Sequence, residues 1–167
     1  MTLEETLAQI KPLDKNAMDV AAKRWDSIAK PLHSLGKMEK LVIQIAGITG
    51  NPDMKIQKRA LVPMCADNGV VEEGVTQTGQ EVTAIVAENF LSGDTSACVM
   101  SRQCGTKVIP VDIGMAVDTK VSKELKVAYG TANMTKGPAM TRAQAVQALE
   151  AGIEMVRRLK EEGYGLL

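Results

Sequence analysis

Aromatic side chains are almost absent from this sequence: its 167 residues include one Phe, one Trp and two Tyr. Proteins that bind single-stranded nucleic acid stack its bases on aromatic rings, so the sequence does not favour that function. It also has no excess of positive charge, because 20 Lys and Arg residues balance 20 Asp and Glu residues. A neutral chain does not attract a phosphate backbone by its net charge, and we therefore expect no nucleic-acid partner.

Histidine and paired cysteines are equally scarce. The chain has one histidine, His33, and three scattered cysteines, Cys65, Cys98 and Cys104, none of which forms a CxxC pair. No usual zinc-site spacing occurs, so we expect no metal. The N-terminus lacks the basic and apolar segments of a signal peptide, and no apolar run approaches the roughly 18 residues of a membrane span. We expect a soluble, cytoplasmic protein with reduced thiols and no membrane contact.

The first 52 residues predict three helices. Thr2 and Glu5 fit a capping box that would open the first helix, and Asp14 is placed to cap the second. Apolar residues between Met38 and Ile48 recur at helical spacing and predict the third helix. We therefore expect residues 1–52 to form a small helical segment.

The pattern changes after residue 52. Residues 59–66 and 107–113 are short apolar runs that predict two strands, although each run contains a proline. Two helices are expected between the strands, the first opened by a capping box of Thr78 and Glu81, the second opened by Asp94 or Thr95. This order of elements indicates a βαβ crossover and hence parallel pairing of the strands.

Residues 115–140 are less regular, with one short strand expected near residues 127–129. A capping box of Thr141 and Gln144 then opens a long amphipathic helix, and residues 164–167 resemble the beginning of another strand. Residues 53–167 thus predict the first part of an α/β domain, with a parallel, Rossmann-like sheet flanked by helices. We expect this fold to continue beyond Leu167, as in a truncated domain.

In an open parallel sheet, ligands bind at the carboxyl ends of the strands. The two expected strands end in Asp67-Asn68-Gly69 and Asp112-Ile113-Gly114. A structural role is the alternative, in which each aspartate hydrogen-bonds its own turn and each glycine supplies a positive φ. Thr78 has a similar alternative role as a helix cap. No Gly-rich phosphate loop and no Ser/His/Asp or Cys/His set accompanies these residues, so catalytic machinery is not visible.

Short blocks of this sequence match those of a known enzyme family in order and interval. The blocks are 30–39 (KPLHSLGKME), 65–70 (CADNGV), 73–75 (EGV), 82–83 (VT), 111–114 (VDIG) and 137–141 (GPAMT). Together they resemble the nicotinate-nucleotide:dimethylbenzimidazole phosphoribosyltransferase family, which acts in cobalamin biosynthesis.

The chain departs from that family at several positions. Leu32 and His33 stand where the family has Pro-Gly, and Asn68 replaces a histidine. The family's base-binding pocket uses a serine, matched here by Thr78, and a glutamine, matched here by Val86. The missing glutamine removes a hydrogen-bonding amide from the pocket, so the resemblance does not fix the identity of the acceptor base.

The resemblance implies transfer of a 5-phosphoribosyl group from nicotinate mononucleotide to 5,6-dimethylbenzimidazole or a related base, without metal or cofactor. It implies that the acceptor base lies against Asp67, Asn68, Thr78, Val82 and Val86. The family's general base is a glutamate late in its sequence, so the resemblance implies no catalytic residue in this chain and an inactive fragment. It also implies a homodimer. A non-catalytic α/β module that binds a small molecule or a protein is the alternative function.

Overall fold

The computed structural model describes all 167 residues and divides them into two compact units. One unit is residues 8–56, and the other combines residues 1–7 with residues 57–167. The predicted division at residues 52 and 53 differs from this one, because the first helix, α1 (Leu3–Ala8), begins in the α/β unit. The backbone N–H of Leu3 donates to Glu150 Oε1 at 3.0 Å, which ties α1 to the last helix, α6 (Arg142–Glu161).

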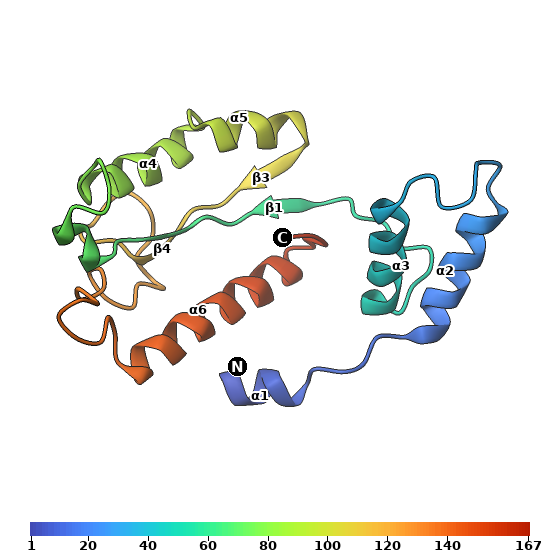
Figure 1. The fold of residues 1–167 in the computed structure, drawn as a ribbon, viewed down its shortest axis with the longest axis horizontal. Helices are drawn as coiled ribbons and strands as arrows, with labels where there is room; N and C mark the ends of the chain where they lie inside the picture. The colour runs from blue at the N-terminus through green and yellow to red at the C-terminus, as the bar shows by residue number, and fades with distance from the viewer. The chain divides into compact units, whose positions relative to one another are not determined.

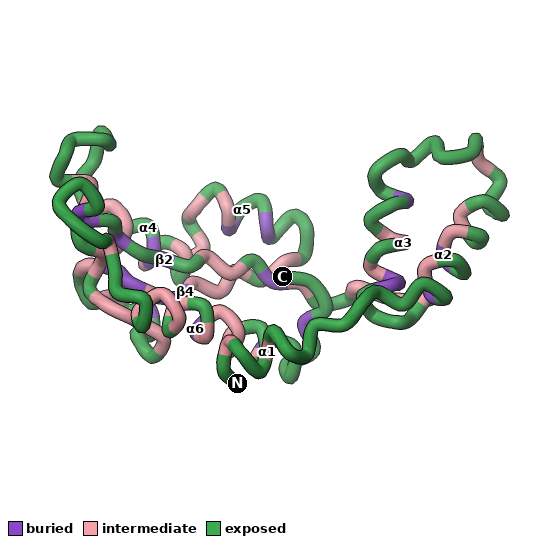
Figure 2. The backbone as a smooth tube through the Cα atoms, turned by 60° about the horizontal axis from the view of Figure 1, so that its bottom comes forward, coloured by how far each residue is buried: buried purple, intermediate pink, exposed green.

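The unit of residues 8–56 consists of two packed helices, α2 (Lys15–Ser27) and α3 (Lys37–Thr49) (Figure 1). Asp14 caps α2 as predicted, accepting from the backbone N–H of Ala17 at 3.0 Å. Small residues let the helices approach closely: an added Cβ at Gly47 would lie 2.6 Å from Met18 Cγ. Figure 2 shows that burial in this unit is confined to a few positions on each helix.

The loop between α2 and α3 is organised around a buried carboxylate. Glu39 is 4% exposed and forms an ion pair of 2.8 Å with Lys30. The same carboxylate accepts the backbone N–H of Leu35 at 3.1 Å. The hydrogen bond from Lys30 lowers the pKa of Glu39, so this carboxylate stays charged at neutral pH. His33, in the same loop, has a φ of 58°, a conformation that opposes any side chain with a Cβ.

The strands of the α/β unit form two parallel pairs, as predicted from the crossover pattern. β1 (Arg59–Leu61) pairs with β3 (Thr106–Val108), and β2 (Met64–Ala66) pairs with β4 (Val111–Gly114). Each predicted strand is therefore broken in two at its proline, which has no N–H to donate. The pairing continues across the break through two bonds of 2.9 Å, from Ile109 N to the Leu61 carbonyl and from Val111 N to the Pro63 carbonyl.

Helices α4 (Glu81–Ser92) and α5 (Ser96–Gln103) lie on one side of the strands, and α6 lies on the other (Figure 1). One core cluster joins β2 to α4 through Cys65, Ala87 and Met115, with Phe90 packed against it. A second joins β1 to α6 through Ala60 and Leu159, with Tyr164. Residue 166, near the end of the chain, forms a parallel bridge to Arg59 beside this second cluster. None of the helices combines the length and the apolar character needed to cross a bilayer.

Most predicted helix starts are confirmed, and one is wrong. The capping boxes of α1 and α6 form, and Thr95 caps α5. The predicted box of Thr78 and Glu81 does not form, because α4 begins after Gln80 and has no side-chain cap. Thr78 lies in the preceding turn, where its N–H donates to Thr76 Oγ1 at 3.2 Å. The strand expected near residues 127–129 is also absent; a single bond of 3.0 Å joins Val127 N to the Ile113 carbonyl.

The left-handed backbone of His33 predicts that His33→Gly is more stable than His33→Ala by about 1 kcal/mol, because glycine has no Cβ to oppose positive φ. Both variants lose the imidazole, so the comparison isolates the backbone effect. Trp25, the one tryptophan of the chain, lies in α2, and its fluorescence reports the thermal unfolding of this unit. Equal melting temperatures for the two variants would contradict the prediction.

Candidate functional site

The carboxyl ends of β2 and β4 meet at one edge of the strands. The backbone N–H of Asp67, the first residue after β2, donates to the carbonyl of Gly114 at 3.0 Å. The two sequence segments singled out for a ligand site are therefore adjacent in space. This edge is where an open parallel sheet places its ligands.

Asp67 and Asp112 are both buried, but they are held in different ways. Asp112 Oδ1 accepts the N–H of Met115 at 2.9 Å, which is the role in its own turn that the structural alternative describes. Asp67 Oδ2 instead accepts the N–H of Ala116 at 2.7 Å, from the loop that follows the neighbouring strand. Its carbonyl accepts the N–H of Thr131 at 3.0 Å. Asp67 thus joins two parts of the loop between β4 and α6 to the end of β2.

The glycines after these aspartates do not supply a positive φ, contrary to the structural alternative. Gly69 is required by close approach: a Cβ there would lie 2.6 Å from the Thr131 carbonyl oxygen and 2.7 Å from backbone atoms of Ala132 and Asn133. These are backbone atoms and cannot rotate away. The turn after β2 and the loop at residues 131–133 therefore fit together only with glycine at this position.

A pocket of about 460 Å³ lies between β2 and α4, and we call it the α4 pocket. The five residues that the resemblance implied for the acceptor base all line it: Asp67, Asn68, Thr78, Val82 and Val86. Val82 and Val86 are one helical turn apart and share a face of α4, which explains how both reach the pocket. The volume falls within the range of small-molecule sites, about 300–1,000 Å³.

Apolar residues of β2 and α4 line one part of the α4 pocket, which we call its wall, and polar residues of the segment before α4 line another part, which we call its rim. Met64 and Cys65 of β2, with Phe90 of α4, form the wall beside the two valines. Threonines and amides form the rim, and Gln80 Nε2 there donates to the Asn68 carbonyl at 3.3 Å. Burial, with the nearby charges of Asp112 and Asp67, raises the pKa of the Cys65 thiol. Cys65 therefore stays protonated and acts as a wall residue rather than a nucleophile.

Sequence reasoning missed several residues of this pocket. Phe90 could have been identified from its helical spacing, because it lies two turns after Val82 and so shares its helix face. Cys65 and Met64 carried no such signal, since their approach to the pocket depends on where the strand breaks. Gln80 was hidden by the incorrect placement of the helix start.

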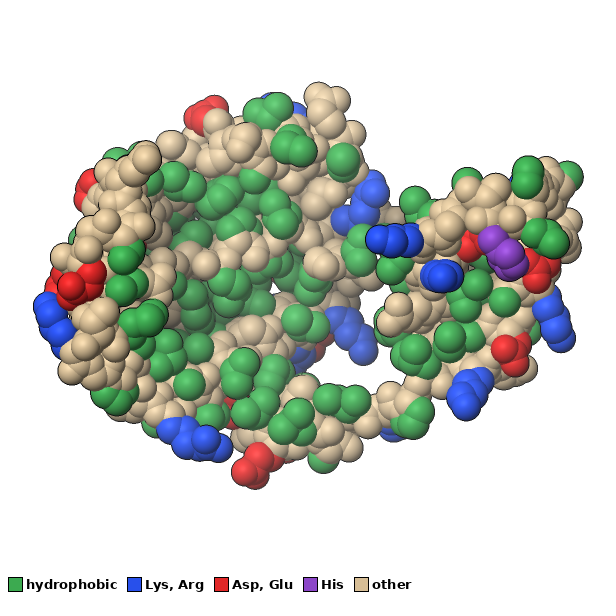
Figure 3. All heavy atoms as spheres, in the orientation of Figure 1, with side chains coloured by type: hydrophobic (Ala, Val, Ile, Leu, Met, Phe, Trp, Pro, Cys, Tyr) green, Lys and Arg blue, Asp and Glu red, His purple; other side chains and the backbone are tan.

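A second pocket, of about 590 Å³, lies toward α6, and we call it the α6 pocket. It shares Ala66 and Asp67 with the α4 pocket, so the end of β2 separates the two. Its other walls are β4, the loops of residues 127–132 and 138–141, and the first turns of α6. Figure 3 shows hydrophobic side chains gathered in the hollow between α4 and α6.

Polar contacts fix the loop after β2 against the loop at residues 133–136. Asn133 Nδ2 donates to Glu73 Oε1 at 2.6 Å, and Thr135 Oγ1 donates to the same oxygen at 3.1 Å. Lys136 forms an ion pair of 2.8 Å with Glu72 and lowers its pKa. Glu72 and Glu73 are therefore occupied in joining two loops.

Comparison with known proteins identifies the family. A family model described as "Phosphoribosyltransferase" matches residues 10–167. Nicotinate-nucleotide–dimethylbenzimidazole phosphoribosyltransferases from Clostridium tetani and Ruminiclostridium cellulolyticum are 49% and 46% identical over 98% and 100% of this chain. A crystal structure of the phosphoribosyltransferase of that name from Thermus thermophilus has a TM-score of 0.83 and 35% identity over 92% of this chain.

The chain belongs to this phosphoribosyltransferase family. The Thermus match also confirms the predicted α/β class with parallel strands. The chain spans about half the length of its relatives: 46% and 48% of the two clostridial sequences and 48% of the Thermus chain. Both pockets are therefore formed by residues from this half of the family fold.

The close approach at Gly69 predicts that Gly69→Ala lowers the free energy of unfolding by about 1–3 kcal/mol, the usual cost of overpacking. Gly137 is the matched control, because no atom lies within 4 Å of a Cβ built there and its φ is not positive. Gly137→Ala should change the stability by less than about 0.5 kcal/mol. Denaturant unfolding followed by circular dichroism measures both. Similar losses for the two variants would show that the fit of the loops at Gly69 is not tight.

Proposed function

We propose that this chain provides the acceptor-base site of an enzyme that transfers a 5-phosphoribosyl group from nicotinate mononucleotide to 5,6-dimethylbenzimidazole or a related base. The products are α-ribazole 5′-phosphate and nicotinate. One observation carries the proposal: the residues implied for the acceptor base, which are spread from Asp67 to Val86 in the sequence, line a single pocket. Membership in the phosphoribosyltransferase family gives the reaction class.

The chemistry of the α4 pocket suits a planar aromatic base. The apolar wall can bury the faces and the methyl groups of a benzimidazole, which is favourable in proportion to the area removed from water. Polar groups at the rim, among them Thr78 and Asn68, are suited to the ring nitrogens. Thr78 does not cap α4, so its hydroxyl is not committed to a helix N–H.

The second pocket supports a reaction of two substrates. Transfer of a group between two molecules requires that they be held in contact with each other. The α4 and α6 pockets meet at Ala66 and Asp67, at the carboxyl edge of the strands. An acceptor base in the α4 pocket would therefore lie beside a second cavity large enough for another small molecule.

The position of Val82 in the apolar wall predicts that Val82→Asp weakens the binding of 5,6-dimethylbenzimidazole at least about tenfold, because burying the base against a carboxylate costs solvation free energy. Ile85 provides the matched control on the same helix, since it is 57% exposed and does not line the pocket. Ile85→Asp should leave the affinity nearly unchanged. Isothermal titration calorimetry measures the two variants and the unmodified chain. Equal weakening by both variants, or no binding to the unmodified chain, would contradict the acceptor-base assignment.

We also predict that this chain binds the base without catalysing the transfer reaction. The titratable side chains of the α4 pocket are Asp67 and Cys65, and the first already accepts a backbone N–H while the second stays protonated. Neither is suited to accept a proton from the base. Incubation with nicotinate mononucleotide and dimethylbenzimidazole should yield no α-ribazole phosphate by chromatography, with the Thermus enzyme as positive control. Turnover near that of the control would refute this prediction.

A further inference from the structure

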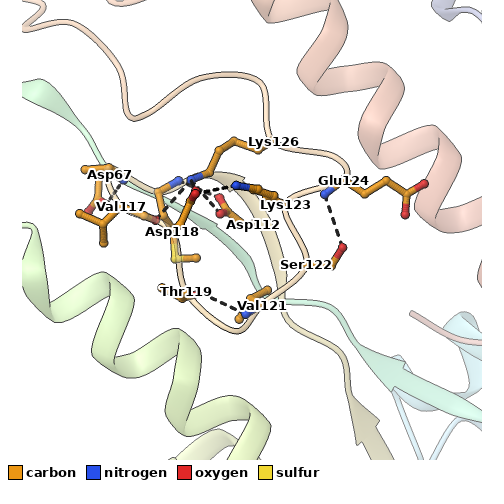
Figure 4. A network of polar contacts seen from close by, with 12 residues as sticks. Asp67, Asp112, Val117, Asp118, Thr119, Val121, Ser122, Lys123, Glu124 and Lys126 are labelled. Carbon is orange, nitrogen blue, oxygen red and sulfur yellow. Dashed lines mark hydrogen bonds and ion pairs between the residues drawn. The ribbon is translucent and has the colours of Figure 1, made fainter.

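Lys126 is a buried cation in the irregular loop between β4 and α6. Its side chain is 6% exposed, although the loop around it has no regular secondary structure. The amine contacts Asp112 Oδ2 at 3.0 Å, Asp118 Oδ1 at 3.1 Å and the Val117 carbonyl at 3.3 Å (Figure 4). The ring of Tyr129 completes the surroundings, with its centroid 4.0 Å from the amine.

The charge of Lys126 is compensated within this cage. Burial acts to lower the pKa of the amine, but the contacts with Asp112 and Asp118 outweigh burial and hold its pKa above the usual value. Asp112 is fully buried, and Lys126 is the cation paired with it. A carboxylate in that position without a partner would be strongly destabilising. The pair therefore keeps both charges inside the fold.

The contacts of the pair converge on the segment Met115-Ala116-Val117. Asp112 holds the first residue of this segment through its N–H, and Lys126 holds the last through its carbonyl. The residue between them, Ala116, directs its own N–H to Asp67 Oδ2 at 2.7 Å. The ion pair thus fixes the donor that orients the Asp67 carboxylate.

We propose that Lys126 is a positioning residue for the acceptor-base site: through Asp112 and Ala116 it sets the orientation of Asp67, the residue that both pockets share. This inference rests on the proposed function for its ligand, but the contacts themselves do not involve the base. Lys126 does not line either pocket, so its effect on binding is indirect.

Lys126→Met tests the proposal, with Lys123→Met as the matched control. Lys123 bonds to the same Asp118 at 2.6 Å, but its side chain is 62% exposed and it forms no ion pair with Asp112. We expect Lys126→Met to reduce the hydrogen-exchange protection of the Ala116 amide and the affinity for dimethylbenzimidazole, each by about tenfold, the equivalent of one lost hydrogen bond. Amides of α4 should keep their protection. Lys126→Arg retains the cation and should restore both quantities, and Lys123→Met should change neither.

The two measurements separate positioning from stability. Unchanged protection of Ala116 in Lys126→Met would overturn the proposal, as would unchanged affinity for the base after that protection is lost. If Lys126→Met does not fold, the double variant Asp112→Asn/Lys126→Met removes both charges of the buried pair. We expect it to fold with Ala116 still unprotected, and retained protection would overturn the proposal. If the unmodified chain binds no base, the proposed function fails, and exchange at Ala116 alone decides whether Lys126 orients Asp67.

Discussion

The parallel pairing of β2 with β4 is the constraint on which both pockets depend. β1 continues into β2 and β3 continues into β4, which gives two rows of strands. Each row contains a proline, so neither row can form an unbroken ladder of hydrogen bonds. The Pro63 carbonyl nevertheless accepts the N–H of Val111, and the rows stay together as far as the bond between Asp67 and Gly114. Their carboxyl ends therefore stop at the same edge. Without this common end, the residues after β2 would not face both α4 and α6, and the two pockets would not share a wall.

Order at this edge comes from buried polar bonds more than from apolar packing. The chain has few aromatic residues, and its core clusters are small sets of Ala, Cys, Met, Val and Leu with one tyrosine. The loop between β4 and α6 has no ladder of its own, so its backbone groups need other partners. Asp67 and Asp112 supply acceptors for three of its N–H groups, from Met115, Ala116 and Thr131. Such bonds fix a loop geometrically, because each buried group would be costly to leave unpaired.

Local features of the sequence predicted local structure well. Asp14, Thr95 and the pair Thr141 and Gln144 cap the helices as expected, because a cap involves residues three positions apart. The same reasoning failed at Thr78, because its N–H donates to Thr76 in a turn and α4 begins only at Glu81. The contacts that build the site could not be predicted in this way. Asp67 and Ala116 are 49 residues apart, and nothing in the spacing of either marks the other. The list of pocket residues came from family resemblance, and the structure places those residues together.

Val86 is an apolar residue on the α4 wall of the α4 pocket, where the resemblance gives the family an amide, and under the proposed function this exchange would change the selectivity for the base. A site built to hydrogen-bond a substrate group strongly rejects analogues that lack the group, because its own polar atoms are left unpaired. An apolar position has no such requirement, and a methylene more or less changes binding by only about 1–3 kcal/mol. With Val82, Val86 and Phe90 on one helix face, the wall of this pocket would select a base by its shape and its buried area. Under the proposed function, a site of this kind would discriminate weakly among benzimidazoles that differ in their ring substituents, and the polar rim at Thr78 and Asn68 would fix the orientation of the ring.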